Sequence, residues 1–351
     1  MGQEATASAS PYRECAGLKP KHNKPSLWPG LLLAVGLGLC AMVLGGWFPV
    51  IGAPVMGILL GMALRNTRGV ALVCQPGLQF ASKKLLQWSI IGLGFGLSIQ
   101  HVVKTGAESL LVTLTTLLAA FVSAWFLGKW LRLESRLKTL IGVGTAICGG
   151  SAIAAVTPII KPEEHETAFA ITTIFIFNVI AVLLFPVMGH WLGMTDIGFG
   201  TWAGTAINDT SSVVAAAYSY SEAAGDYATI VKLTRATLII PICLGLVALQ
   251  VWQHKKSGTG GFRLRQIFPW FILWFVVASA VNSLGLIPAF MAGPLRFFAS
   301  FTMVVALTAI GLSSDLARMR SAGVRPVLHG MGVWAAVVIT SLTVQYWAGS
   351  W

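Results

Sequence analysis

The sequence predicts an all-α polytopic membrane protein with about eleven transmembrane helices. The first observation is composition: the 351 residues are 56% hydrophobic and only 10% charged, with a mean hydropathy of +0.77. Soluble domains carry about 25% charged residues. The second observation is a series of long apolar runs, which are continuous and do not alternate every second residue. Continuous runs of this kind favour spanning helices over a β-barrel.

The chain divides into a short polar tail and one apolar domain. Residues 1–27 are polar and lack the apolar core of a signal peptide, so we expect a disordered cytoplasmic tail. Residues 28–351 are expected to form a single transmembrane domain, embedded in the lipid bilayer. The predicted spans are 28–46, 49–64, 86–100, 108–128, 139–160, 167–190, 199–220, 227–252, 267–287, 295–313 and 326–348.

Most basic residues fall on one side of this arrangement. Nineteen of the 24 lie in the tail or in connections that an eleven-span chain places on the same side. The positive-inside rule makes that side cytoplasmic, with the N-terminus inside and the C-terminus outside. The net charge of +12 is therefore explained by orientation, and nucleic-acid binding is not expected. These residues are Arg13, Lys19, Lys21, Lys24, Arg65, Arg68, Lys83, Lys84, Lys129, Arg132, Arg136, Lys138, Lys255, Lys256, Arg263, Arg265, Arg318, Arg320 and Arg325.

The opposite side is predicted to carry the acidic connections. It would hold Lys104, Lys161 and Arg296 beside the acids Glu163, Glu164, Glu166, Glu222 and Asp226. The run from Glu163 to Glu166 resembles a metal cluster only superficially, because its residues are adjacent in one loop. The five cysteines form no CxxC pair, so neither a disulfide framework nor a zinc site is expected, and no cofactor is predicted.

Two segments carry the same unusual pattern within apolar spans. Residues 144–155 read GTAICGGSAIAA and residues 204–216 read GTAINDTSSVVAA. A glycine pair weakens a helix, and a cluster of Asn, Asp, Thr and Ser competes for the backbone hydrogen bonds. Both segments are therefore predicted to be helices broken at mid-membrane, where secondary transporters bind substrates and ions. The alternative is that the small residues only permit close helix packing.

Three charged residues lie well inside predicted spans, away from their ends. Asp209 is the one acid near the middle of a span, and an intramembrane acid indicates function by default. Lys232 and Arg235 are three residues apart and share a helix face. They are expected either to attract an anionic substrate or, in the case of Arg235, to pair with Asp209 and hold the helices together.

Inverted repeats are suggested by a second pair of segments. The triplet Gly-Leu-Ser occurs at 96–98 and at 311–313, on spans that run in opposite directions in this arrangement. The two GTAI spans instead run in the same direction. The two matches imply different repeat offsets, so at least one of them is coincidental.

The two GTAI segments, followed by VKLTRATLIIP at 231–241, resemble the YeiH family of bacterial inner-membrane proteins. The resemblance covers the chain from about residue 28 onward. It implies a transporter with inverted repeats and broken helices, and an export activity that the family's name assigns to sulfate.

These observations predict a secondary transporter for a small anion, such as sulfate or a related sulfur oxyanion or sulfonate, in the bacterial inner membrane. Asp209 would couple transport to a proton or sodium ion, and a homo-oligomer is compatible with the sequence. The alternatives are an anion channel and a non-transporting sensor or scaffold. An enzyme is not expected, because no nucleophile with a base is evident. The expected substrate-binding residues are Thr145, Cys148, Gly149, Gly150, Ser151, Asn208, Thr210, Ser211, Ser212, Lys232 and Arg235.

Overall fold

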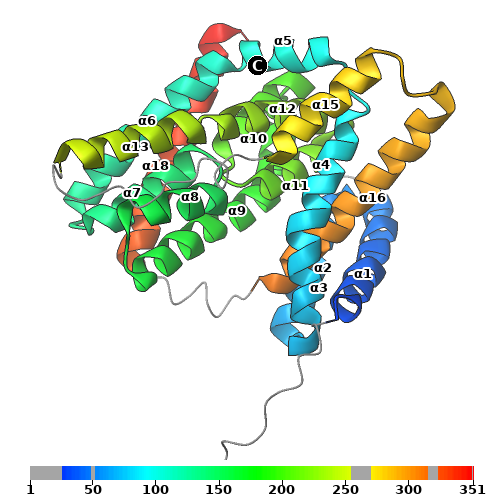
Figure 1. Cartoon of the computed structure of the whole chain (residues 1–351), viewed down its shortest axis with the longest axis horizontal. Helices are drawn as coiled ribbons and strands as arrows, with labels where there is room; N and C mark the ends of the chain where they lie inside the picture. Colours follow the sequence, from blue (N-terminus) through cyan, green and yellow to red (C-terminus); the bar gives the residue numbers. More distant parts are fainter. Residues whose placement is uncertain (1–25, 49–51, 254–269, 315–322, 350) are drawn as a thin grey trace, which may run out of the picture.

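A computed structural model describes residues 26–48, 52–253, 270–314, 323–349 and 351. Within these residues the chain is almost entirely helical and contains no strand (Figure 1). The predicted tail falls almost wholly outside the described part. The helices are α1 Trp28–Trp47, α2 Gly52–Thr67, η1 Leu72–Cys74, α3 Gln75–Phe80, η2 Ala81–Leu85, α4 Leu86–Gly94, α5 Ile99–Glu108, α6 Leu110–Trp130, α7 Ser135–Ala146, α8 Gly150–Ile160, α9 Glu164–Trp191, α10 Asp196–Ala206, α11 Thr210–Tyr220, α12 Glu222–Thr237, α13 Ile239–Gln253, α15 Trp270–Ser283, α16 Ala289–Ser313 and α18 Val324–Ala348.

Six helices in the described part are long and apolar enough to cross a membrane. A seventh span is counted if Leu72–Gly94 and Ile99–Glu108, which meet at a bend of 107°, are taken together. The all-helical prediction is thus confirmed, whereas the number of about eleven spans is not. The six are Trp28–Trp47, Leu110–Trp130, His165–Trp191, Glu222–Leu246, Phe290–Ser313 and Val324–Ala348.

The third predicted span, 86–100, has different boundaries in the structure. The helical run begins earlier, in η1 and α3, and ends at Gly94. Ser98 then caps α5 by accepting a hydrogen bond from the His101 N–H at 3.2 Å. A capped helix start beside a sharp bend explains why α5 does not continue α4. It follows that the segment after Gly94 is a separate amphipathic helix.

The helices α1, α2, α4 and α16 gather on one side of the molecule (Figure 1). Small residues allow their backbones to approach closely: Gly45 of α1 packs against Ala53, and Gly61 of α2 packs against the Thr308 carbonyl and Leu312 of α16. Such contacts are typical of helix packing in membranes, where burying apolar surface gives no advantage over lipid.

The directions of the long helices α6, α9 and α18 identify the two ends of the remaining part of the molecule. Near the start of α18, Gly330 packs against Thr173 of α9, and after its end the Trp351 indole N–H donates to the Leu192 carbonyl at 3.4 Å, so α9 and α18 run in the same direction. His329 of α18 contacts the Ala124 carbonyl near the end of α6 at 2.9 Å, so α6 runs the opposite way. We call the end where α6 finishes and α18 starts the basic side, because Lys129, Arg132, Arg136, Lys138 and Arg325 lie there.

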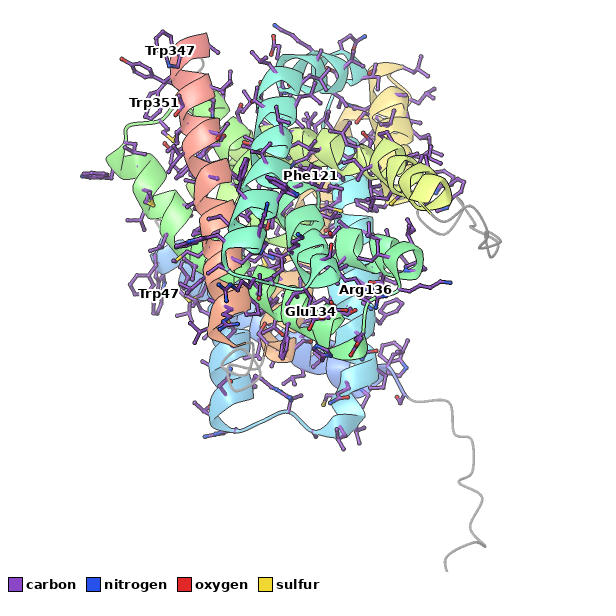
Figure 2. All side chains as sticks on the ribbon, turned by 90° about the vertical axis from the view of Figure 1, so that its left-hand side faces the viewer. Trp47, Phe121, Glu134, Arg136, Trp347 and Trp351 are labelled. Atoms are coloured by element: carbon purple, nitrogen blue, oxygen red, sulfur yellow. The ribbon has the colours of Figure 1, made fainter. Side chains whose placement is uncertain are left out.

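The two ends differ in side-chain chemistry. Trp347 and Trp351 lie at one end of the molecule, and Glu134 and Arg136 lie toward the other (Figure 2). Large apolar side chains of α6 and α16 point outward, with Leu118 63% exposed and Phe298 65% exposed. The inward face of α6 instead carries small and polar residues, including Thr116 and Ala120. An apolar exterior around a tighter, more polar interior is the pattern of a protein in lipid.

The predicted fifth span forms a helical hairpin, hairpin 1, made of α7 and α8. The helix α7 starts on the basic side, directly after α6. Ile153 of α8 packs back against Gly144 of α7, and α8 leads through three residues into the start of α9, which is again on the basic side. Hairpin 1 therefore enters from the basic side, turns at Ile147–Gly149 and returns to the same side.

The predicted seventh span forms hairpin 2, made of α10 and α11, which enters from the opposite side. At its base the Ser221 hydroxyl donates to Asp196 Oδ1 at 2.6 Å, and the Tyr220 hydroxyl donates to the Met194 carbonyl at 2.5 Å. The Phe199 and Tyr220 rings stack with centroids 4.0 Å apart. These contacts join the start of α10 to the end of α11, so the chain turns back at residues 207–209.

The hairpins correct two statements made from the sequence. The GTAI segments do not run in the same direction through the bilayer, because each ends the first helix of a hairpin and the two hairpins enter from opposite sides. The acidic connection around Glu163 lies on the basic side, not opposite it. Both corrections follow from one error, which was to read an apolar run of spanning length as a span.

Candidate functional site

The tips of the two hairpins meet in the interior of the molecule. In hairpin 1, α7 ends at Ala146 and α8 begins at Gly150. Gly149 between them has a φ of 66°, and a Cβ at this position would lie 3.3 Å from the Cβ of Asp209 in hairpin 2. Glycine adopts positive φ without steric cost. The two predicted broken helices are therefore real breaks, and the structure brings them into contact.

Lys232 and Arg235 of α12 insert between the hairpin tips, and both are fully buried. The Lys232 ammonium donates to the Ile147 carbonyl at 3.0 Å and to the Ile207 carbonyl at 2.8 Å. Each Lys232 bond thus goes to a different hairpin. A single side chain holds both turns at a fixed distance.

Arg235 makes the equivalent contacts one helical turn along α12. Its Nε donates to the Ala146 carbonyl at 2.6 Å, one terminal nitrogen donates to the Thr145 carbonyl at 2.9 Å, and the other donates to the Thr205 carbonyl. These carbonyls lie at the C-terminal ends of α7 and α10, where the helix dipole is negative and the carbonyls lack intrahelical partners. The two cations therefore satisfy both helix ends.

This geometry does not show the pair with Asp209 that was one of the two roles expected for Arg235. Its three nitrogens all bond to main-chain carbonyls, and in the described part of the chain the structure does not pair it with Asp209. Direct contact of Lys232 or Arg235 with a substrate stays a prediction.

Asp209 caps the start of α11. Its Oδ2 accepts hydrogen bonds from the Ser211 N–H at 3.0 Å and from the Ser211 hydroxyl. Its own N–H donates to Oδ1 of Asn178, a buried residue of α9, at 3.2 Å. A carboxylate at the N-terminus of a helix is stabilised by the free N–H groups there. The acid that the sequence singled out is thus held at a helix start and half-buried.

A cavity of about 390 Å³, the tip cavity, opens beside the two tips. The predicted residues Ser151, Thr210, Ser211 and Ser212 line it together with Asp209. Its other walls come from η2, from α4 and mainly from the first half of α9, which begins on the basic side, with one residue each from α15 and α16. The full lining is Ser82, Lys83, Leu86, Gln87, Ile90, Ser151, Ile171, Ile174, Phe175, Asn178, Asp209, Thr210, Ser211, Ser212, Phe271 and Ile310.

The remaining predicted residues lie behind the cavity wall. Thr145, Cys148 and Asn208 are buried and do not line the cavity. The Thr145 hydroxyl and both polar atoms of the Asn208 amide have no hydrogen-bond partner within the described residues. Buried amides and hydroxyls are normally bonded. The hydroxyl of Thr145 and the amide of Asn208 are thus buried polar groups whose bonding capacity the described residues do not use.

Sequence reasoning missed four polar residues of the cavity, namely Ser82, Lys83, Gln87 and Asn178. Asn178 is the one asparagine in the predicted span 167–190, and this isolated polar residue could have identified it. Lys83 was counted only as an orienting charge, and Gln87 was not noticed. No local pattern connects Lys83 or Gln87 to the GTAI segments, because the tertiary fold brings α4 and its preceding turn beside the hairpins.

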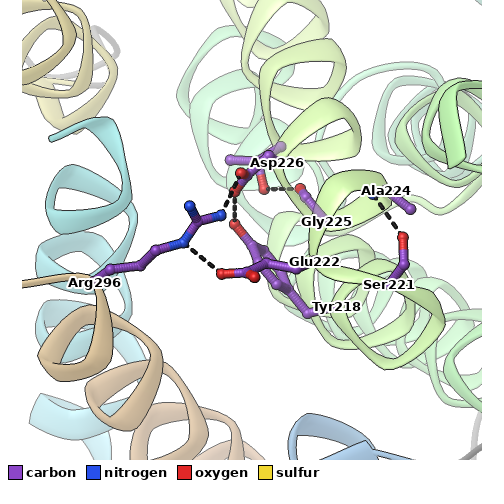
Figure 3. A network of polar contacts seen from close by, with 8 residues as sticks. Tyr218, Ser221, Glu222, Ala224, Gly225, Asp226 and Arg296 are labelled. Atoms are coloured by element: carbon purple, nitrogen blue, oxygen red, sulfur yellow. Dashed lines mark hydrogen bonds and ion pairs between the residues drawn. The ribbon is translucent and has the colours of Figure 1, made fainter. Parts of the chain in front are cut away.

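A second polar cluster joins α11 and α12 to α16 near the base of hairpin 2. Arg296 of α16 reaches across to Glu222 and Asp226 of α12, at 2.5 and 2.8 Å (Figure 3). The Tyr218 hydroxyl donates to the other oxygen of Asp226 at 2.5 Å. Arg296 and Asp226 are thus ion-paired on the side opposite the basic side, and they tie the helices around α16 to hairpin 2.

The apolar exterior and the long apolar helices define the chain as a multi-pass helical membrane protein. The family described as "Conserved hypothetical protein 698" matches residues 29–330, and the chain belongs to it. This confirms the resemblance carried by the two GTAI segments.

Curated relatives support the same assignment. A UPF0324 membrane protein of Streptococcus pyogenes serotype M18 is 43% identical over 331 residues, which is 92% of this chain and 98% of the relative. A UPF0324 membrane protein of Streptococcus pneumoniae strain R6 is 43% identical, covering 90% of this chain and 96% of its own length. One of Clostridium tetani is 40% identical, with 91% and 97% covered.

Proposed function

We propose that this protein is a secondary transporter of a small anion, such as sulfate or a related sulfur oxyanion or sulfonate, that binds in the tip cavity. The observation that carries the proposal is the meeting of two helical hairpins, entering from opposite sides, at a polar cavity in an apolar molecule. Discontinuous helices that meet at the bilayer midplane are the usual substrate sites of secondary transporters.

The chemistry of the cavity favours an oxyanion. Helices α8 and α11 both begin at the cavity, and the first N–H groups of a helix suit anions. Hydroxyls of Ser151, Thr210 and Ser212 add donors beside these helix starts. The negative ends of α7 and α10 are occupied by Lys232 and Arg235. At the cavity, the start of α8 has no side-chain cap, whereas Asp209 caps the start of α11.

The opposite entry of the hairpins supports an inverted repeat. Both GTAI segments end the first helix of a hairpin, at Ala146 and at Ala206. Inverted repeats allow a transporter to expose one site alternately to the two sides of the membrane. An anion channel would instead need a continuous polar pore, and the packed cluster of Lys232 and Arg235 lies between the tips.

The expected orientation is unchanged by the hairpins. If the other nine predicted spans all cross, the shorter α2 and α15 included, replacing two spans with two hairpins moves only the connections before and after α9. None of the nineteen orienting basic residues lies in these connections. We therefore place the basic side in the cytoplasm of a bacterial inner membrane. The tip cavity then faces the cytoplasm.

Asp209 is proposed to couple transport to a proton or a sodium ion. An ionised carboxylate repels an anion in the same cavity, so either a proton on Asp209 or a bound cation would favour anion binding. Asp209→Asn keeps the helix cap, because asparagine is an equally good N-cap residue. We expect this variant to fold and bind, but to lose accumulation in proteoliposomes driven by a proton or sodium gradient. Normal accumulation with an unchanged pH dependence would show that Asp209 does not couple transport.

The test of the function is thermal stabilisation of the purified protein by a panel of ligands. Sulfate, sulfite, thiosulfate, taurine and a dicarboxylate are compared at constant ionic strength, each with and without sodium. Binding to the folded protein raises the unfolding temperature. We expect at least one sulfur oxyanion or sulfonate to stabilise the protein, followed by uptake of that ligand into proteoliposomes. If none of them stabilises the protein, the proposed substrate class is wrong.

A further inference from the structure

We propose that Lys83 supplies the positive charge of the anion site, from the part of the tip cavity's wall that η2 forms. This inference rests on the proposed function and assigns a binding residue to its site. The side chain comes from η2, in the group of helices around α16, whereas the helix starts at Ser151 and Thr210 come from the hairpins. The anion would thus be held between two parts of the molecule.

Lys83 is the one cationic side chain among the described residues that line the cavity. It is exposed, and within the described part of the chain it forms no ion pair with an acid. The two hairpins contribute hydroxyls and the Asp209 carboxylate to the lining of the same cavity. A net negative ligand needs a balancing charge in this setting, and a lysine ammonium without an acidic partner provides one.

The two buried cations do not supply this charge directly. Lys232 and Arg235 are 0% exposed and do not line the cavity. Their donors are directed at five main-chain carbonyls of the hairpins. A donor that already satisfies a helix end cannot turn to a ligand without leaving that end unpaired. Their charges therefore serve the fold of the tips.

The local backbone at Lys83 is also unusual. Residues Ala81–Leu85 form one π-helical turn between two α-helical stretches. Single π-turns within helices are rare and frequently occur at functional sites. Here the turn contains two adjacent lysines, of which Lys83 lines the cavity and Lys84 does not. The pair therefore offers a matched test within one turn.

The experiment compares Lys83→Gln with Lys84→Gln, which remove the same charge from neighbouring exposed positions. Binding of sulfate, sulfite and taurine is measured for each protein by thermal stabilisation, at constant ionic strength. Losing a charge-assisted hydrogen bond weakens binding about tenfold or more. We expect this loss in Lys83→Gln, a change of less than about twofold in Lys84→Gln, and recovery of part of the affinity in Lys83→Arg. The unfolding temperature without ligand should be the same in all variants.

The outcomes separate this inference from the proposed function. If an anion stabilises the wild-type protein and Lys83→Gln binds it as well as Lys84→Gln does, the role of Lys83 is wrong and the transport proposal stands. If both variants lose affinity equally, only the general charge of the turn contributes, and the specific contact is again wrong. If no anion stabilises the wild-type protein, both proposals fail.

Discussion

At the scale of single residues, Gly149 and Gly150 have different tasks although they are adjacent and were predicted to act together. Gly149 has positive φ and faces Asp209 across the tip contact, whereas a Cβ at Gly150 would meet nothing within 4 Å. Gly150 is the first residue of α8. The first glycine is required by backbone geometry and the second is not.

This difference predicts opposite effects of alanine at the two positions. Gly149→Ala places a β-carbon in a left-handed conformation and should cost about 1–3 kcal/mol. Gly150→Ala should be neutral or stabilise by a few tenths of a kcal/mol, roughly, because alanine favours a helix. Unfolding temperatures of the two purified variants check this. Equal destabilisation by both would contradict the assigned tip geometry.

At the scale of helices, α12 holds the tips of both hairpins in place. Arg235 and Lys232 contact the C-terminal ends of α7 and α10 through one face of one helix. Replacing Arg235 with methionine would leave three buried carbonyls without donors. An unsatisfied buried group costs about 1–3 kcal/mol, so we expect Arg235→Met to be strongly destabilising.

The measurement is the unfolding temperature in detergent, with Arg136→Met as the control. Arg136 is an exposed arginine at the start of α7. Its replacement should leave stability nearly unchanged. Arg235→Lys should recover little of the loss, because an ammonium cannot reproduce a planar fork directed at three carbonyls. If the Arg235→Met protein is as stable as the Arg136→Met protein, Arg235 does not stabilise the contact between the hairpins.

The ion pairs of Arg296 connect α16 to α12 at the base of hairpin 2. The side chain of Asp226 is only 14% exposed, and that of Arg296 is 38% exposed. By contrast, Lys104 and Glu108 of α5 are 74% and 52% exposed and 3.8 Å apart. Arg296→Gln should therefore cost about 1 kcal/mol, and Lys104→Gln close to nothing, since exposed pairs contribute little. Thermal unfolding of both variants compares them directly, and an equal effect would contradict the distinction.

At the scale of the whole molecule, the hairpins decide which side of the membrane the connections before and after α9 occupy. They place His165, at the start of α9, on the same side as Arg136. Simple alternation of eleven spans would place it with Lys104, on the other side. Single cysteines at these three positions, in a background without the native cysteines, can be labelled with a membrane-impermeant maleimide.

We expect Arg136→Cys and His165→Cys to be labelled from one side and Lys104→Cys from the other. The labelling should be done on right-side-out and inverted vesicles, so that each position has a positive result in one preparation. Labelling of His165→Cys together with Lys104→Cys would show that hairpin 1 crosses the membrane. The hairpin topology would then be wrong.

The charge pattern could not have detected the hairpins. Two hairpins that enter from opposite sides remove two crossings, so every connection after α11 keeps the side that eleven spans assign to it. The connection at 161–163 and the residues that start α9 do change sides, but they carry both a lysine and acids and add little to the basic excess. An apolar run of about 22 residues satisfies the length of a span and of a two-helix hairpin alike.

The sequence by itself determined the helical membrane class, the position of both breaks and the presence of three charged residues, Asp209, Lys232 and Arg235, deep within apolar segments. These follow from local properties: hydropathy, glycine and capping residues, and the cost of charge within an apolar segment. Only the tertiary structure decided that each break is a turn and not a kink, and that the two tips touch. It also decided that the two cations bond to carbonyls while Lys83 lines the cavity. These facts depend on contacts between segments that lie far apart in the chain, and no local pattern of residues encodes them.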